Sequence, residues 1–376
     1  MKYYIVAARN KLFFLFYKVV LKPIFFRMDP EDVHDRMNVV GKVLGKYRIS
    51  QLFSRVLFGY SHPSLEQTVL GIKFENPVGL AAGFDKNGEL TDIIPFVGFG
   101  FEEIGSVTGN RCEGNPKPRL WRLQKSEGLV VYYGLKNDGA GAIRARLLGK
   151  KFVRPIGTSV AMTNCKENME LNTAVGDYAK AFTSFTDIGH YFTINISCPN
   201  AEGGQPFVDA DKLHILLDSL DKIYTSKPVF IKLSPDITLE KVDTILDVAK
   251  KHRVHGIIVT NLTKKRDNPA ILDLNIPAHG GISGKPVQSM SDDLIAHIYK
   301  RESGRFVIIG CGGIFTAEDA YRKIRLGATL LQLITGMIYQ GPQVIGEINR
   351  GIVRLLSRDG YANISEAIGA AHNKQK

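Results

Sequence analysis

The sequence predicts a (β/α)8 barrel with an N-terminal extension, and three observations support this fold. The 376 residues are 44% hydrophobic and 23% charged, which is typical of a soluble globular protein with a large core. From about residue 70, short β-rich runs alternate eight times with helical patterns. No GxGxxG turn follows the first run, as it would in a doubly wound open sheet. We therefore divide the chain into an extension over residues 1–58 and a barrel over residues 59–376.

Residues 1–28 form a basic and aromatic leader. They contain six Lys or Arg residues, eight aromatic residues and no acidic residue. Lys18 and Lys22 interrupt the apolar runs, so the leader lacks the roughly 20 apolar residues of a membrane-spanning helix. We expect the leader to lie on an anionic membrane surface, with its rings in the interface and its cations at the headgroups. The alternative is a terminus that packs on the barrel.

Two short amphipathic helices should complete the extension. Asp29 can cap the first helix, Pro30 suits its first position, and apolar residues follow at helical spacing as far as Leu44, before a stop at Gly45. The second helix is expected over residues 50–58. Their apolar faces would either form the mouth of a tunnel at a membrane or pack on the barrel.

The barrel units are predicted from β-rich runs that are each followed by an amphipathic helical pattern. The eight strands are expected over residues 78–81, 101–107, 156–160, 191–196, 229–233, 256–259, 306–310 and 329–333. The eight helices are expected near residues 89–97, 139–148, 174–187, 209–225, 239–252, 288–302, 316–326 and 342–357. In such a barrel, the chemistry takes place where the strands end at the carboxyl face.

Glycine-rich loops cluster near the ends of the last three predicted strands. Without a Cβ atom, a glycine lets backbone N–H groups approach a phosphate closely, and a helix N-terminus adds its dipole. These loops favour a phosphorylated cofactor or substrate, although the same glycines could serve only in tight turns. The residues concerned are Gly284, Gly312, Gly313, Thr335 and Gly336.

Lys86 and Lys232 stand at strand ends on the same face. A buried lysine needs an anionic partner to keep its charge. Such a lysine would stabilise the negative charge that a flavin gains on reduction. A Schiff-base lysine and a salt bridge at the barrel rim are the alternatives.

Three amides and a thiol occupy neighbouring strand ends. Asn195, Asn200 and Asn261 offer the donors and acceptors that recognise the edge of a planar ring such as a pyrimidine. Cys198 lies between the first two amides. Because a free thiol has a pKa of about 8.5, Cys198 is suited to remove a C–H proton beside a carbonyl. A packing role is the alternative.

Net charge and cysteine spacing limit the partners. The 49 basic and 37 acidic residues give a net charge of 49 − 37 = +12, which favours a polyanionic partner. The excess is concentrated in an aromatic leader without a recognition motif, so we expect a membrane surface and no nucleic acid. The four cysteines have neither zinc-site nor CxxC spacing, so we expect no metal site and a reducing, cytoplasmic compartment.

Together, the strand-end motifs resemble those of dihydroorotate dehydrogenases, the FMN enzymes of pyrimidine synthesis. The matching stretches are NPVGLAAGFDKNGE (76–89), EIGSVTGN (103–110), GNPKPRLWRL (114–123), INISCPN (194–200), IKLSPD (231–236), TNLT (260–263), GGISGKP (280–286), IIGCGGI (308–314) and ITGMIYQGP (334–342). The segment MDPEDVHD (28–35) and the leader are similar to the membrane-associated class, whose N-terminal helices form a quinone tunnel. The resemblance implies oxidation of dihydroorotate to orotate, with electrons passing through FMN to a membrane quinone. It also implies a peripheral protein on the cytoplasmic side of the cell membrane.

The resemblance further assigns roles to residues. Cys198 would be the base that deprotonates C5 of dihydroorotate while C6 delivers hydride to flavin N5, and His34 and Arg122 would lie by the quinone head. FMN would be surrounded by Ala82, Gly83, Lys86, Ser106, Ser159, Asn195, Lys232, Thr260, Gly284, Gly313, Ile334 and Thr335. Dihydroorotate or orotate would be held by Lys86, Asn195, Asn200 and Asn261.

Three positions depart from the pattern of the quinone class. Cys198 stands where that class has Ser, and a Cys there is typical of the soluble classes. In the substrate loop, which here spans residues 131–137, Val131 replaces an Asn that binds substrate. Ser159 replaces an Asn that contacts FMN. A soluble-type dihydroorotate oxidase, or an FMN enzyme acting on another cyclic imide or enone, therefore stays as an alternative function. A binding module on an inactive barrel is a third.

Overall fold

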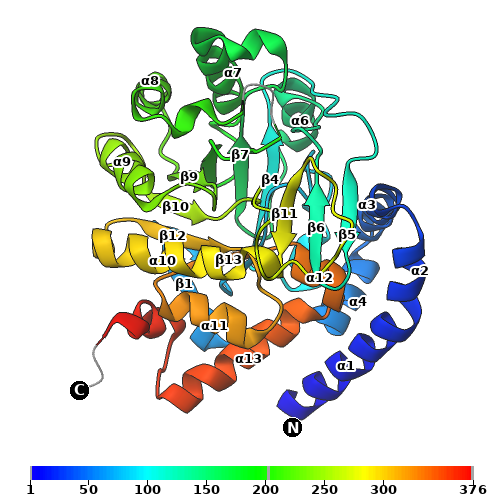
Figure 1. Ribbon diagram of the computed structural model, residues 1–376. Coiled ribbons are helices and arrows are strands. Elements are labelled where there is room, and N and C mark those ends of the chain that lie inside the picture. Colours follow the sequence, from blue (N-terminus) through cyan, green and yellow to red (C-terminus); the bar gives the residue numbers. More distant parts are fainter. Residues whose placement is uncertain (1, 201–203, 374–376) are drawn as a thin grey trace.

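Eight parallel strands close into a barrel, which confirms the predicted fold (Figure 1). In chain order they are β3 (Val78–Leu80), β4 (Phe101–Val107), β7 (Ile156–Val160), β8 (Tyr191–Asn195), β9 (Val229–Leu233), β10 (Gly256–Val259), β12 (Val307–Cys311) and β13 (Leu330–Leu333). Each strand pairs with the next in the chain, and β13 closes the barrel by pairing with β3.

The computed structural model describes residues 2–200 and 204–373, without the side chains of residues 2–5. Met1 of the predicted leader, the side chains of Lys2, Tyr3 and Tyr4, and the last three residues of the predicted barrel region lie outside this description.

Burial on both faces explains why the barrel strands are short apolar runs rather than alternating patterns. Strands β7, β8 and β9 are buried at every residue. Some of the polar residues on the strands pair with one another inside the barrel. The fully buried Glu103 accepts hydrogen bonds at Oε2 from Tyr191 (3.2 Å), Thr193 (2.9 Å) and Gln332 (2.9 Å). This polar layer lies within an otherwise apolar core.

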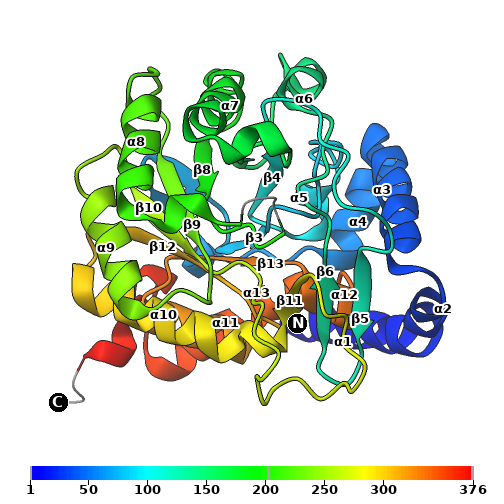
Figure 2. The same cartoon turned by 45° about the horizontal axis from the view of Figure 1, so that its top comes forward.

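A ring of helices surrounds the strands (Figure 2). They are α5 (Ile94–Val97), α6 (Ala140–Leu147), α7 (Leu171–Thr183), α8 (Ala210–Asp221), α9 (Leu239–Ala249), α10 (Gln288–Glu302), α11 (Ala317–Arg325), α12 (Thr335–Gln340) and α13 (Val344–Asp359). The predicted helix over 89–97 is wrong over its first half. There the Asp85 carboxylate accepts hydrogen bonds from the N–H groups of Asn87, Glu89 and Leu90, and this turn replaces a helical one.

Two small antiparallel sheets were not predicted. One is a hairpin of β1 (Gln67–Val69) and β2 (Ile72–Phe74). The other has the strand order β11–β6–β5, from β11 (Gly281–Gly284), β6 (Gly128–Val131) and β5 (Leu120–Leu123). Its outer members come from the segments after β4 and after β10, so the sheet joins two loops that are far apart in the sequence.

The described part of the N-terminal extension is helical apart from short breaks at residues 28–29 and at Tyr47. Its elements are α1 (Lys2–Phe16), a π-helical segment (Tyr17–Leu21), α2 (Lys22–Arg27), α3 (Pro30–Lys46) and α4 (Arg48–Phe58). Asp29 caps α3 as predicted, because its Oδ1 accepts from the N–H groups of Glu31 and Asp32. The predicted stop at Gly45 is wrong by one residue, since α3 continues to Lys46.

One side of the leader packs on α4 and on the barrel, and the other is exposed. Arg9 donates to the carbonyls of Val56 (2.6 Å) and Gly59 (3.2 Å), and the Tyr17 hydroxyl donates to that of Ile338 (2.6 Å). The exposed side carries Leu12, Leu15, Phe16, Val19, Val20 and Ile24. Among the described residues, no helix has the length and hydropathy of a membrane-crossing segment.

Candidate active site

A cavity opens at the carboxyl ends of the barrel strands, between the strand-end loops, the antiparallel sheet and α3. Fifteen of the seventeen residues to which the resemblance assigns a role line it, as do Gly312 and Gly336. The fifteen are His34, Ala82, Gly83, Lys86, Ser106, Asn195, Cys198, Asn200, Lys232, Thr260, Asn261, Gly284, Gly313, Ile334 and Thr335. The (β/α)8 topology brings them together because all eight strands end at this face.

Ser159 and Arg122 do not line this cavity. Ser159 is fully buried, and its Oγ lies 2.8 Å from Oγ of Ser106, which does line it. Arg122 donates to the Met28 carbonyl at 2.8 Å and lies over the Phe26 ring, in a neighbouring groove. The two residues predicted to meet the quinone, His34 and Arg122, therefore lie in different hollows.

The amide side chains are oriented by hydrogen bonds to neighbouring loops. Asn195 donates to Ser106 Oγ at 2.8 Å and accepts from the Ser197 hydroxyl at 2.9 Å. Asn261 donates to the carbonyl and Oγ of Ser197 at 3.1 and 3.0 Å. Such contacts fix which edge of each amide is available to a ligand.

Asn200 keeps one acceptor unused. Its Nδ2 donates to the Val131 carbonyl at 2.8 Å, so the backbone of Val131 contacts the site although its side chain cannot hydrogen-bond. The Asn200 Oδ1 atom is buried without a hydrogen-bond partner. Because an unpaired buried acceptor is costly, Oδ1 is suited to receive a donor from a ligand.

Lys86 and His34 meet at the side of the cavity next to α3. Lys86 Nζ lies 3.0 Å from His34 Nε2 and 4.1 Å from the Tyr133 ring centroid. Burial lowers the pKa of Lys86 to about 8, and nearby Asp35 partly opposes this shift. Burial, and then the charge of Lys86, lower the pKa of His34 well below its ordinary value, so this imidazole is neutral and accepts at Nε2.

Lys232 has no anionic partner among the residues that the structure describes. It lies in β9, its side chain is 4% exposed, and it makes no hydrogen bond or ion pair with another described residue. A buried ammonium without a partner is strongly unfavourable. An anionic group in the cavity would remove this penalty, which fits a flavin that carries negative charge when reduced.

The glycine loops border the cavity in backbone conformations that require glycine. A Cβ atom on Gly284 would lie 2.2 Å from the Glu127 carbonyl oxygen, and one on Gly313 would lie 2.3 Å from the Gln288 side chain. Both glycines also have positive φ angles, so these positions require glycine. The hydroxyls of Ser283 and Thr335 lie 2.8 Å apart beside them. Together with the unpaired lysine, these loops fit FMN.

Cys198 lies on the loop after β8. It lines the cavity, is partly exposed and forms no disulfide. Asn195 and Asn200 line the cavity on either side of it in the sequence. A thiol held among amides that can orient a planar substrate is placed for proton abstraction.

The antiparallel sheet, which was not predicted, forms part of the cavity wall through Leu120 and Leu129. Tyr133 and Lys136, in the expected substrate loop after β6, also line the cavity, and the Tyr133 hydroxyl is buried without a hydrogen-bond partner. The sequence feature that could have predicted this sheet is the long segment between β4 and α6, which has no helical pattern.

Comparison with known proteins agrees with this geometry. The family model for dihydroorotate dehydrogenase matches residues 64–356. A curated protein of Gloeobacter violaceus named dihydroorotate dehydrogenase (quinone) is 39% identical over 354 residues, which are 93% of this chain and 98% of that protein. One of the same name from Trichodesmium erythraeum is 36% identical over 376 residues, which are 95% and 99% of the two chains.

A solved structure shows the same fold. The crystal structure of an Eimeria tenella DHODH in complex with ferulenol has a TM-score of 0.80 at 29% identity, and covers 92% of this chain and 96% of that one. The family match, the relatives and this structure confirm the resemblance found in the sequence. The chain belongs to the dihydroorotate dehydrogenase family.

Proposed function

We propose that the cavity binds FMN and dihydroorotate side by side and that Cys198 is the base of a quinone-dependent dihydroorotate dehydrogenase. The single observation that carries the proposal is that Lys86, Cys198, Lys232 and Gly313 line one cavity. The quinone-dependent relatives give the overall reaction: dihydroorotate is oxidised to orotate, a step of pyrimidine biosynthesis, and a quinone receives the electrons.

Different residues would contact the flavin ring and the phosphate group of FMN. Lys232 would meet the pyrimidine edge of FMN, because it is a buried cation without a hydrogen bond or ion pair to any other described residue. Gly284, Gly313 and Thr335 would hold the phosphate. When bound, FMN supplies a two-electron acceptor, which no side chain of this protein can provide.

The substrate contacts surround Cys198. Asn195, Asn200 and Asn261 would hold the dihydroorotate ring, with the unpaired Oδ1 of Asn200 accepting one of its N–H groups. Lys86 would bind its carboxylate. Cys198 would then take the proton from C5, beside the ring carbonyl, as a thiolate.

The quinone would approach from the side of α3. His34 lines the main cavity, and Arg122 lines the neighbouring groove with Phe26 and Met28. Leu120 lines both hollows, so they adjoin at β5. We expect the quinone head to reach the flavin past this residue.

The N-terminal helices would hold the protein on an anionic membrane as a peripheral protein, on the cytoplasmic side. Their exposed apolar side chains include Leu12 and Val19 in the leader and Phe53 and Val56 in α4. Lys11 and Lys18 are exposed between them and could meet lipid headgroups.

A steady-state assay tests the proposal. Dihydroorotate is offered to the purified full-length chain with a quinone analogue, fumarate or NAD as acceptor. We expect yellow protein containing FMN and turnover with the quinone alone. Turnover with fumarate or NAD but not with quinones would instead support the soluble-type oxidase, which Cys198 and Val131 favour. A protein that neither contains nor takes up FMN would contradict both.

A further inference from the structure

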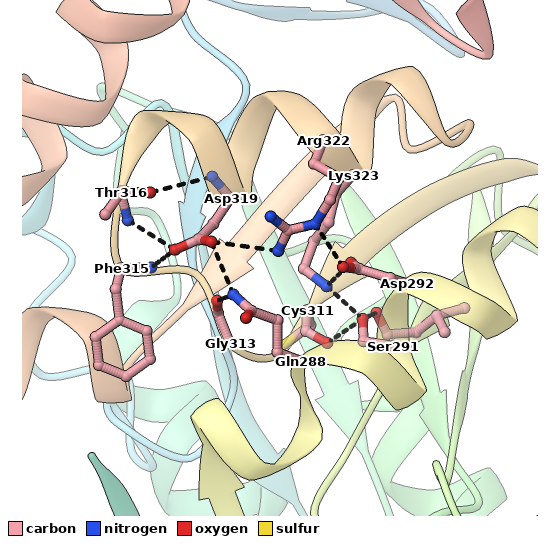
Figure 3. Close-up of polar contacts among 11 residues, drawn as sticks. Gln288, Ser291, Asp292, Cys311, Gly313, Phe315, Thr316, Asp319, Arg322 and Lys323 are labelled. Carbon is pink, nitrogen blue, oxygen red and sulfur yellow. Dashed lines mark hydrogen bonds and ion pairs between the residues drawn. The ribbon is translucent and has the colours of Figure 1, made fainter. Parts of the chain in front are cut away.

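A group of charged and polar side chains lies behind the glycine loop that follows β12, and its members Lys323 and Ser291 are fully buried (Figure 3). Lys323 of α11 is 0% exposed, and its Nζ donates to Ser291 Oγ at 2.9 Å and to Asp292 Oδ1 at 2.6 Å. Arg322 donates to the Asp292 carboxylate at 2.7 Å and to Asp319 at 3.2 Å. Two cations thus face two carboxylates, and the group is neutral overall.

Ser291 connects this group to the ends of two barrel strands. Its Oγ lies 2.9 Å from the carbonyl oxygen of Cys311 in β12 and 3.2 Å from that of Val259 in β10. Because the buried ammonium donates to Oγ, the single hydroxyl proton is directed at these carbonyls. The next residues along the chain, Thr260 and Gly312, both line the cavity.

A second contact holds the far side of the same loop. The Gln288 amide donates to the Gly313 carbonyl and, at 2.8 Å, to Asp319 Oδ1. Asp319 in turn accepts from the N–H groups of Phe315 and Thr316 at 3.1 Å each. Figure 3 shows both contacts reaching the loop from α10 and α11. The loop is therefore fixed from behind at two points.

A fully buried lysine is an unfavourable choice for stability alone, because a well-packed apolar residue commonly does as well. The geometry points to Lys323 as a positioning residue for the phosphate group of FMN: it orients Ser291, and Ser291 fixes the backbone that leads into Gly312 and Gly313. This inference rests on the proposed function, since it places the flavin phosphate at that loop. Asp292 balances the charge of Lys323, so the effect is positional.

Riboflavin, which has the flavin ring and no phosphate, separates this role from a general loss of structure. We expect Lys323→Met to weaken FMN binding to the flavin-free full-length chain by about tenfold or more, and riboflavin binding by less than about twofold. Quenching of flavin fluorescence measures both affinities. Ser291→Ala should show the same selectivity, and serves if Lys323→Met does not fold. Because both changes break one connection, the double variant should bind FMN no more weakly than Lys323→Met.

Lys227→Met is the matched control. Lys227 also donates to backbone carbonyls, of Phe185 (2.8 Å) and Ile188 (2.6 Å), but it precedes β9 at the opposite end of the barrel. The Lys227→Met variant should show the same preference for FMN over riboflavin as the wild type. Equal weakening of both ligands in the Lys323 and Ser291 variants, or unchanged FMN binding, would overturn the inference. A wild-type chain that binds no FMN would overturn the proposed function instead.

Discussion

Lys86 and Lys232 line the same cavity, but among the described residues only Lys86 has charged side chains nearby to offset its charge. Lys86 lies among the charges of Asp35, Lys136 and Glu31, and burial is the main reason that its pKa falls to about 8. Lys232 has neither a hydrogen bond nor an ion pair with a described residue. An anionic ligand would compensate both lysines, so ligand charge should control affinity at this site.

The lowered pKa of Lys86 predicts how orotate binding depends on pH. Below pH 8 the amine is mostly charged and attracts the orotate carboxylate, and above pH 8 the charge is progressively lost. Orotate affinity should therefore fall as the pH rises from about 6.5 to about 9.5, which is about one and a half units on either side of this pKa. The affinity is measured from the perturbation of the flavin spectrum by orotate. Lys86→Arg stays charged over this range and should flatten the dependence. A flat wild-type profile would show that Lys86 does not bind the carboxylate.

At the scale of elements, one buried ion pair fastens the extension to the barrel. Glu31, in the first turn of α3, is 3% exposed and accepts from Arg119 Nε and Nη2 at 3.1 and 2.8 Å. Arg119 directly precedes β5, whose sheet forms part of the cavity wall. The pair therefore links α3 of the extension to the wall of the active-site cavity.

Glu31→Ala should lower the free energy of unfolding by about 3 kcal/mol or more, because it leaves Arg119 buried without its counter-ion. Urea unfolding of the full-length chain measures this change. Lys42→Ala is the control, since its pair with Glu89 is 44% and 21% exposed and is worth less than about 1 kcal/mol. Similar losses in the two variants would mean that the buried pair does not hold α3 in place.

The elements also show what the sequence could predict. The eight barrel strands were found because each is a short β-rich run followed by polar or glycine residues. The position of chemistry at strand ends then identified Cys198, Lys86 and the amides. The β5–β6–β11 sheet was not found, because its strands are four residues long and β11 pairs with a segment about 150 residues earlier. Arg122 and His34 line different hollows because of the way α2 and α3 cross β5. No local sequence pattern encodes this arrangement.

At the scale of the whole molecule, the extension gives one side of the protein an apolar and basic surface. Leu12 and Val19 of the leader are 68% and 70% exposed, next to exposed lysines. Figure 1 shows the N-terminal helices on one side of the barrel and α9 on the other. A membrane on the first side would lie near both hollows that the quinone is proposed to use.

The double variant Leu12→Glu/Val19→Glu should therefore bind anionic lipid vesicles at least about tenfold more weakly. Each change adds a negative charge that anionic lipids repel and removes an apolar contact with the membrane. Vesicle sedimentation measures the bound fraction, and flavin content should not change. Leu239→Glu places the same charge on exposed α9 and is the control. Equal binding of all variants would rule out the leader as the membrane contact.

Anaerobic mixing of the FMN-loaded protein with dihydroorotate tests most directly whether flavin, substrate and thiol share one cavity. The account predicts loss of flavin absorbance in the wild type, its return on addition of a quinone analogue, and a loss at least about a hundredfold slower in Cys198→Ala. Cys165→Ala, which alters a thiol outside the cavity, should behave as the wild type. A wild-type flavin that stays oxidised, or a Cys198→Ala variant as fast as the wild type, would contradict it.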